Sequence, residues 1–178
     1  MSLSVSVLLF IVLILATGAE RIYELVVSVR NMKRSFAAGG TEYGRSHLPA
    51  MIALHTGMLL GAMIEVVVLE RLFLGTLGWI FLVAALGCQA ARYWFIWALG
   101  DQWNTRVIVI PGAKRVRRGP YSLPWLRHPN YWVVVIEGIA LPMVHSAWIT
   151  AAVFTVLNAV LLLGFRIPTE NKALEGLK

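Results

Sequence analysis

The chain changes character at residues 119–131, which read GPYSLPWLRHPNY. This stretch ends a strongly basic segment and opens an apolar run from Pro129 to Phe165, in which Glu137 is the single acidic residue. A second polar cluster, Arg166 to Asn171, stands where that run ends. In so apolar a chain, polar residues within or beside hydrophobic segments are the first candidates for a functional site.

The composition indicates a membrane protein. Apolar residues make up 58% of the 178 residues, and the mean hydropathy is +0.72; in soluble domains roughly half of the residues are apolar. The net charge of +7 comes from Lys and Arg between apolar segments, as in cytoplasmic loops, which argues against a nucleic-acid partner. The single cysteine, Cys88, and two histidines without a third ligand, His47 and His55, predict no metal site.

The apolar segments predict an all-α integral membrane protein with about five transmembrane helices. Residues 1–19 read as a retained first helix, because no basic region precedes them as in a signal peptide, which is the alternative. That helix continues to about residue 40, and further spans are expected at 47–69 and 73–99. Pro142 divides the last apolar run into a tight helical hairpin, 130–144 and 147–165. Residues 103–110 alternate weakly, which suits a short strand or an extended segment.

The distribution of Lys and Arg predicts the orientation in the membrane. It places the N-terminus outside and the C-terminus in the cytoplasm, across the inner membrane if the source is bacterial. Three polar segments, 40–47, 100–131 and 166–175, then meet at the cytoplasmic face. The chain reads as one membrane domain, with an N-terminal three-helix part (1–99) and a C-terminal part (100–178) that carries the site.

Glu137 is the sharpest single candidate. It lies six residues after Tyr131, so it is about 9 Å deeper along the same helix. It has either a catalytic role or a structural pairing with Arg92 or Arg127. Gln89 lies three residues before Arg92, so both share one helix face. No phosphate-binding loop, dinucleotide fingerprint or GxSxG nucleophile motif is present in the sequence, which excludes the soluble folds that carry them.

The polar motifs together resemble the isoprenylcysteine carboxyl methyltransferase family. The residues that carry the resemblance are GPY at 119–121, RHPNY at 127–131, and Arg166 with Glu170 and Leu174. EYG at 42–44, HLP at 47–49, RY at 92–93 and WNTR at 103–106 resemble its bacterial branch. The resemblance implies a multi-pass enzyme that transfers a methyl group from S-adenosylmethionine. The C-terminal half would wrap the cofactor, while a lipophilic acceptor enters from the bilayer.

The resemblance also implies roles for individual residues. His128, Tyr131 and Glu170 match positions that contact the cofactor, and Tyr121 and Pro129 belong to the same motifs. Arg127 and Arg166 match paired arginines near cofactor and acceptor, so we predict a catalytic set of Arg127, Glu137 and Arg166. The sequence departs from the family pattern in three places: five residues separate Tyr121 from Arg127, Val133 replaces a glycine, and Asn171 replaces a second acid.

The acceptor stays open at this point. A prenylcysteine carboxylate needs only an arginine to orient it, whereas the hydroxyl of an alkylpyrone or alkylresorcinol lipid needs a base, such as Glu137 or His128. The expected partners are therefore a lipophilic or prenylated substrate and membrane lipids, and the oligomeric state is not predicted. Two alternatives are an NADPH-dependent sterol-type reductase, which shares the RHPNY element, and a membrane scaffold without catalytic activity.

Overall fold

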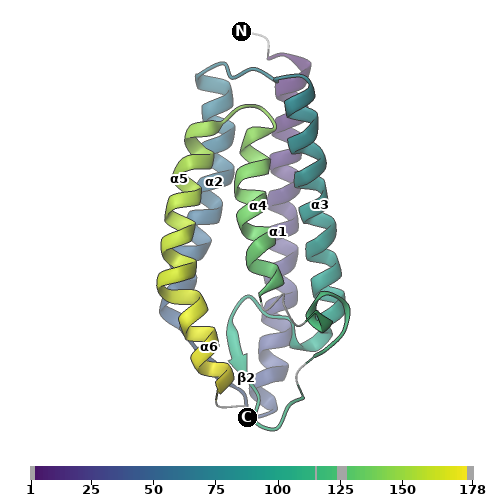
Figure 1. The fold of residues 1–178 in the computed structure, drawn as a ribbon, viewed down its shortest axis with the longest axis vertical. Helices are drawn as coiled ribbons and strands as arrows, with labels where there is room; N and C mark the ends of the chain where they lie inside the picture. Colours follow the sequence, from purple (N-terminus) through teal and green to yellow (C-terminus); the bar gives the residue numbers. More distant parts are fainter. Residues whose placement is uncertain (1–2, 115, 124–127, 176–178) are drawn as a thin grey trace.

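The chain folds as a bundle of long helices that run up and down beside one another (Figure 1). A computed structural model describes residues 3–114, 116–123 and 128–175. The helices are α1 (Val5–Ala37), α2 (Leu48–Val68), α3 (Thr76–Leu99), α4 (Pro129–Met143), α5 (Trp148–Leu161) and α6 (Ile167–Glu175). The N-terminus lies at one end of the bundle, and α6 and the C-terminus lie at the other.

Four of the five predicted spans are long and apolar enough to cross a membrane. They cover Val5–Ala37, Arg45–Val68, Thr76–Gln102 and Trp148–Glu175. The remaining helix, α4, has 15 residues, fewer than the ~20 that a full crossing needs. The all-helical membrane class is therefore confirmed, and the count of five spans stays a prediction.

The helix ends follow from local sequence. The Ser4 side chain accepts a hydrogen bond from the Val7 amide and caps α1. At the other end of α1, Gly39 has a φ of +80°, and the Gly40 amide donates to the carbonyl of Ser35 at 2.9 Å. This left-handed glycine ends the helix in the usual way, close to where the paired glycines predicted it.

Helix α4 is the most enclosed element and packs against both α3 and α5. Gly138 allows the close approach to α5, since a Cβ there would lie 2.1 Å from a ring carbon of Phe154. The predicted break at Pro142 is present, because α4 ends one residue later. The turn that follows buries His145 between the rings of Phe10 and Phe73, which gives this histidine a structural role.

The start of α5 is tied to α2 by a buried carboxylate. Glu65 accepts hydrogen bonds from the backbone amides of Ile149 and Thr150, at 3.2 and 2.8 Å, and from the Thr150 hydroxyl. Arg71 completes the set with an ion pair to Glu65 at 2.9 Å. Because the first amides of a helix lack partners within the helix, Glu65 caps α5 from a neighbouring element.

Two short strands join the polar segments at the C-terminal end of the bundle. Strand β1 (Thr41–Tyr43) pairs antiparallel with β2 (Val107–Val109), which confirms an extended segment within 103–110. Arg106 donates to both carboxylate oxygens of Glu42, at 2.9 and 3.1 Å. A Cβ on Gly44 would meet the side chain of Thr169 at 2.9 Å, so α6 lies against this strand pair. The three polar segments therefore converge, as predicted.

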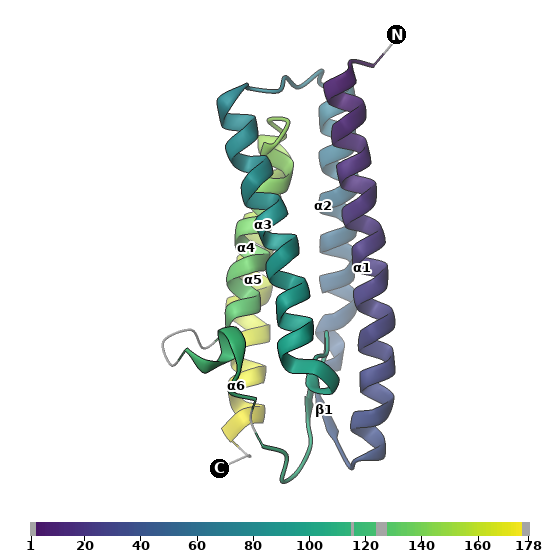
Figure 2. The same ribbon diagram turned by 90° about the vertical axis from the view of Figure 1, so that its right-hand side faces the viewer.

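Helices α5 and α6 form one continuous column (Figure 1), which lies partly behind α4 in the turned view of Figure 2. The two helices are joined by a π-helical turn, Leu162–Arg166. The predicted end of the fifth span at residue 165 therefore marks a change in helix type, and the helix itself continues to Glu175. Such turns insert an extra residue and are frequent at functional sites. Here the turn ends on Arg166.

Candidate functional site

Four of the predicted site residues meet where α4 begins and α6 follows the π turn. The Tyr131 hydroxyl donates to the Glu170 carboxylate and accepts from Arg166 Nε at 3.1 Å. His128 Nδ1 lies 3.3 Å from the other oxygen of Glu170. The imidazole also stacks on the Tyr131 ring, with centroids 5.3 Å apart. We call His128, Tyr131, Arg166 and Glu170 the polar cluster.

The local sequence places these side chains. Pro129 is the first residue of α4, a position that suits proline because the missing N–H would have no partner there. Tyr131 follows two residues later and points toward α6. Glu170 comes one turn after Arg166, so both face the same side. Arg166 is anchored by a 2.6 Å hydrogen bond to the carbonyl of Thr105, in the loop that follows α3.

Tyr121 lies on the short helical turn Gly119–Ser122. Burial, with a smaller effect from the Glu170 carboxylate, raises the pKa of Tyr121. Its hydroxyl therefore stays protonated and acts as a donor near neutral pH. Gly119 has a φ of +57°, and a Cβ there would lie 3.3 Å from the side chains of Trp94 and Ala98, so this turn needs glycine. Arg127 lies outside the described residues.

Two of the predicted departures can be placed. Val133 is buried with Cys88 and Phe95, and Tyr121 packs against the same group. The side chain of Val133 therefore helps to set the position of Tyr121. Asn171, the residue in place of the second acid, is exposed on α6.

Glu137 is the buried centre of a second polar network. One carboxylate oxygen accepts from Arg21 Nη2 and Gln89 Nε2, both at 2.8 Å. The other accepts from Arg92 Nε at 3.0 Å and Nη2 at 2.6 Å. Arg21 and Arg92 also pair with Glu24, at 2.8 and 3.4 Å. The pairing with Arg92 expected for Glu137 is thus present, and the catalytic role of Glu137 stays a prediction.

Sequence reasoning missed the contribution of α1 to this region. Besides Arg21 and Glu24, Ser28 accepts from the Thr105 amide at 3.0 Å and donates to Asn104. Asn31 donates to the carbonyls of Gly100 and Trp103. The signal was the spacing of the buried polar residues on α1, which repeat every three or four positions: Glu24, Ser28, Asn31 and Ser35.

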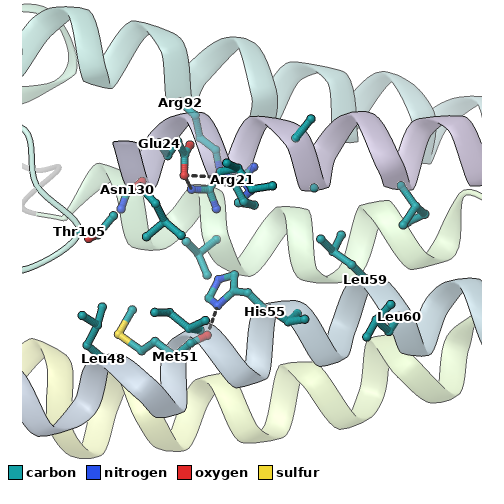
Figure 3. A pocket seen from close by; sticks show the side chains of 18 of the residues that line it. Arg21, Glu24, Leu48, Met51, His55, Leu59, Leu60, Arg92, Thr105 and Asn130 are labelled. Atoms are coloured by element: carbon teal, nitrogen blue, oxygen red, sulfur yellow. Dashed lines mark hydrogen bonds and ion pairs between the residues drawn. The ribbon is translucent and has the colours of Figure 1, made fainter. Parts of the chain in front are cut away.

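A cavity of about 560 Å³ reaches one side of both networks, although His128, Glu137 and Glu170 do not line it. Its polar part is lined by side chains of both networks and of the loop after α3: Arg21, Glu24, Arg92, Asn104, Thr105, Asn130, Tyr131 and Arg166. Figure 3 shows Thr105 and Asn130 toward one end of the cavity and Leu59 and Leu60 toward the other. The volume lies in the range of single small-molecule sites.

His55 faces the polar part from α2. Its Nδ1 lies 2.8 Å from the Met51 carbonyl, which can only accept, so Nδ1 carries the hydrogen. Its ring meets Phe154 edge-on. Among the described residues, no group of three His, Cys, Asp or Glu side chains is placed to hold a metal ion.

The architecture is that of a helical membrane protein with a buried polar site at one end of the bundle, next to a largely apolar cavity. Residues 79–176, more than half of the chain, match the isoprenylcysteine carboxyl methyltransferase family. The chain therefore belongs to this family, and a methyltransferase-like membrane function follows.

The relatives found are bacterial. The chain is 36% identical to YpbQ, an uncharacterized protein of Bacillus subtilis, over 94% of this chain and 97% of the relative. It is 29% identical to an uncharacterized protein of Haemophilus influenzae, over 89% of this chain and 91% of the relative. The match to bacterial proteins agrees with the bacterial branch of the family. No solved structure matches the chain.

Proposed function

We propose that the protein is an integral membrane O-methyltransferase that uses S-adenosylmethionine and methylates a lipophilic acceptor. The observation that carries the proposal is the continuity of the site. Tyr131 and Arg166 belong to the polar cluster and also line the cavity, whose far end is apolar. A water-soluble methyl donor and a lipid can therefore meet there from different sides.

The polar cluster fits the cofactor chemically. Glu170 offers a carboxylate for the two ribose hydroxyls, and its side chain keeps 28% exposure. His128 Nδ1 is buried without a hydrogen-bond partner of good geometry, and Tyr121 supplies a protonated hydroxyl nearby. When bound, S-adenosylmethionine supplies an activated methyl group on a sulfonium. Glu170, His128, Tyr131 and Tyr121 would hold it, with Pro129 fixing the start of α4.

The chain contributes mainly positioning. Methyl transfer requires the acceptor oxygen in line with the methyl group, in a site that excludes water. Arg166 is held by the Tyr131 hydroxyl and the Thr105 carbonyl, so its guanidinium is fixed beside the cavity. In this proposal Glu137 holds Arg21 and Arg92 at the cavity wall, because its two oxygens already accept four hydrogen bonds.

The acceptor is either a prenylcysteine-type carboxylate or a lipid hydroxyl. A carboxylate would be oriented by Arg166, with Arg127 as the second predicted arginine. A hydroxyl would need a base, and His128, within the polar cluster, is the candidate, since its Nδ1 makes no hydrogen bond of good geometry. Both acceptors carry an apolar chain, which suits the apolar part of the cavity.

We further propose that the C-terminal end of the bundle is cytoplasmic. The basic residues Arg30, Lys33, Arg34, Arg45, Lys114, Arg117 and Arg118 lie in the segments at that end. Such clusters mark the cytoplasmic side of bacterial membrane proteins. The N-terminus is then outside and the polar cluster faces the supply of cofactor.

A transfer assay tests the proposal. The purified protein is incubated with methyl-labelled S-adenosylmethionine and either a farnesylated cysteine analogue or an alkylpyrone, and label is counted in the lipid extract. We expect transfer to one acceptor, with Glu170→Ala as the inactive control. A product that base hydrolyses is an ester, and a stable product is an ether. Absence of transfer together with tight NADPH binding would instead support the reductase.

A further inference from the structure

His55 brings into the cavity a ring nitrogen that the described part of the chain does not use. Its Nδ1 donates to the Met51 carbonyl at 2.8 Å, so in the neutral imidazole Nε2 carries a lone pair and can only accept. Nε2 has no hydrogen-bond partner among the described residues, and it is not one of the atoms that the protein encloses completely. Figure 3 shows the ring projecting from α2 into the space between this helix and Arg21. His55 therefore offers a hydrogen-bond acceptor to a molecule in the cavity.

Two contacts hold the His55 ring in one orientation. The Met51 carbonyl lies one helical turn earlier on α2, so the hydrogen bond ties Nδ1 to the backbone of its own helix. The ring also meets Phe154 of α5 edge-on, with centroids 5.3 Å apart and an angle of 82° between the planes. Groups that take part in catalysis depend on such support, because it keeps the reacting atom in a fixed place.

His55 is the one ionisable side chain that α2 contributes to the cavity lining. The other lining residues of this helix are apolar apart from Thr56: Leu48, Met51, Ile52, Leu59, Leu60 and Met63. The charged groups Arg21, Glu24 and Arg92 line the cavity from α1 and α3. A polar head group that lies between these charged groups and α2 would therefore meet His55.

His128 is less well placed to meet an acceptor. It does not line the cavity, its Nδ1 lies 3.3 Å from the Glu170 carboxylate, and its ring stacks on Tyr131. All three residues belong to the polar cluster, which the proposed function gives to the cofactor. His55 lies outside that cluster, so it can contact the acceptor without giving up a cofactor contact.

The ion pairs beside the cavity favour an uncharged head group. Arg21 pairs with Glu24 and with Glu137, at 2.8 Å each. Arg92 pairs with the same two carboxylates, at 3.4 and 2.6 Å. Two guanidinium groups and two carboxylates leave no surplus positive charge in this network for an anionic head. A carboxylate would also face the lone pair of His55 Nε2, whereas a hydroxyl donates to it.

We propose that His55 is the catalytic base that receives the proton of a hydroxyl acceptor. The inference rests on the proposed function for the methyl transfer itself. In that step the acceptor oxygen forms a bond to the methyl carbon, the carbon–sulfur bond breaks with its electron pair on sulfur, and the hydroxyl proton passes to His55 Nε2. Charge is conserved, because the sulfonium becomes a neutral thioether while the imidazole becomes an imidazolium. Before the transfer, the same nitrogen orients the acceptor by accepting its hydroxyl hydrogen.

Two substitutions separate the hydrogen bond from the proton transfer. In His55→Asn the amide can still donate to the Met51 carbonyl, but it does not reach the position of Nε2. In His55→Gln the amide oxygen reaches that position and accepts a hydrogen bond, but it is not basic. His47→Asn makes the same exchange at a histidine that does not line the cavity, and it is the matched control. All three variants should bind S-adenosylmethionine as the wild type does, which verifies that they are folded.

The first readout is equilibrium binding, without cofactor, of a labelled 3-alkylphenol and of its methyl ether. The ether has no hydrogen to donate, so it leaves Nε2 without a partner. We expect the preference for the phenol over the ether to fall about tenfold in His55→Asn and to persist in His55→Gln and in the control. The second readout is methyl transfer to the phenol, which should fall a hundredfold or more in both His55 variants, the size of a general-base contribution.

An unchanged preference for the phenol in His55→Asn would overturn the inference, and so would wild-type transfer rates in either His55 variant. Transfer to the farnesylated cysteine analogue alone, at a rate that neither variant alters, would overturn the inference and leave the proposed function standing. If the preference for the phenol depends on His55 but no acceptor receives a methyl group, the proposed function fails, while His55 remains the residue that recognises the hydroxyl.

Discussion

Replacing Glu137 separates a structural role from a catalytic one. The carboxylate is 1% exposed and accepts hydrogen bonds from Arg21, Gln89 and Arg92. Glu137→Gln removes the charge that balances the buried guanidinium of Arg92 and the partly buried one of Arg21. Removing one partner of a buried ion pair costs about 3–5 kcal/mol, since the remaining charge is left without compensation. The retained amide oxygen places the expected loss near 3 kcal/mol.

The free energy of unfolding is measured in mixed micelles by titration with a denaturing detergent, followed by tryptophan fluorescence. The matched control is Glu170→Gln, which removes a carboxylate from the more exposed polar cluster and should cost much less stability. The folded fraction of Glu137→Gln should still bind S-adenosylmethionine. An unchanged unfolding midpoint combined with complete loss of methyl transfer would refute this reasoning and make Glu137 a catalytic group.

Three further predictions concern the cluster and the packing. Tyr131→Phe removes the hydroxyl between Glu170 and Arg166. Hydrogen bonds to charged groups contribute about 1.5–3 kcal/mol, so equilibrium binding of labelled S-adenosylmethionine should weaken roughly tenfold or more. Unchanged affinity would place the cofactor elsewhere. Because burial raises the pKa of Tyr121, its hydroxyl is protonated below that raised value, and the effect of Tyr121→Phe on binding should be the same at mildly acid and mildly alkaline pH. Gly138→Ala puts a Cβ 2.1 Å from Phe154 and should cost about 1–3 kcal/mol in the unfolding titration, whereas Gly57→Ala, whose Cβ meets nothing within 4 Å, should not destabilise.

Much of the helix layout could be predicted, because long uncharged runs have few other interpretations. The boundaries at Ala37 and Met143 follow from glycine and proline, whose backbone limits act locally. The short fourth helix was predicted as well, since the expected span of 130–144 differs by one residue at each end from Pro129–Met143. Hydropathy alone could not place this break, because apolar residues continue on both sides of Pro142, and it was the proline that marked it.

The polar cluster was predictable from the sequence motifs that contain its residues. The contacts confirm that these residues lie close together, and their roles stay predictions. The buried network was predicted in part, since Glu137, Gln89 and Arg92 stand out in apolar helices. Arg21 and Glu24 lie in the predicted continuation of the first helix, and no role was predicted for them. Their role depends on how α1 packs against α3 and α4, and that tertiary arrangement is not encoded in a local pattern. Their spacing along one helix face was the available signal.

The most direct measurement of the central claim is saturation binding of labelled S-adenosylmethionine and of NADPH to the purified protein, in the wild type and in Glu170→Ala. The claim predicts that S-adenosylmethionine binds at one site, that Glu170→Ala weakens this binding by an order of magnitude or more, and that NADPH does not compete. Binding of NADPH alone, or binding of S-adenosylmethionine that Glu170→Ala leaves unchanged, would contradict it.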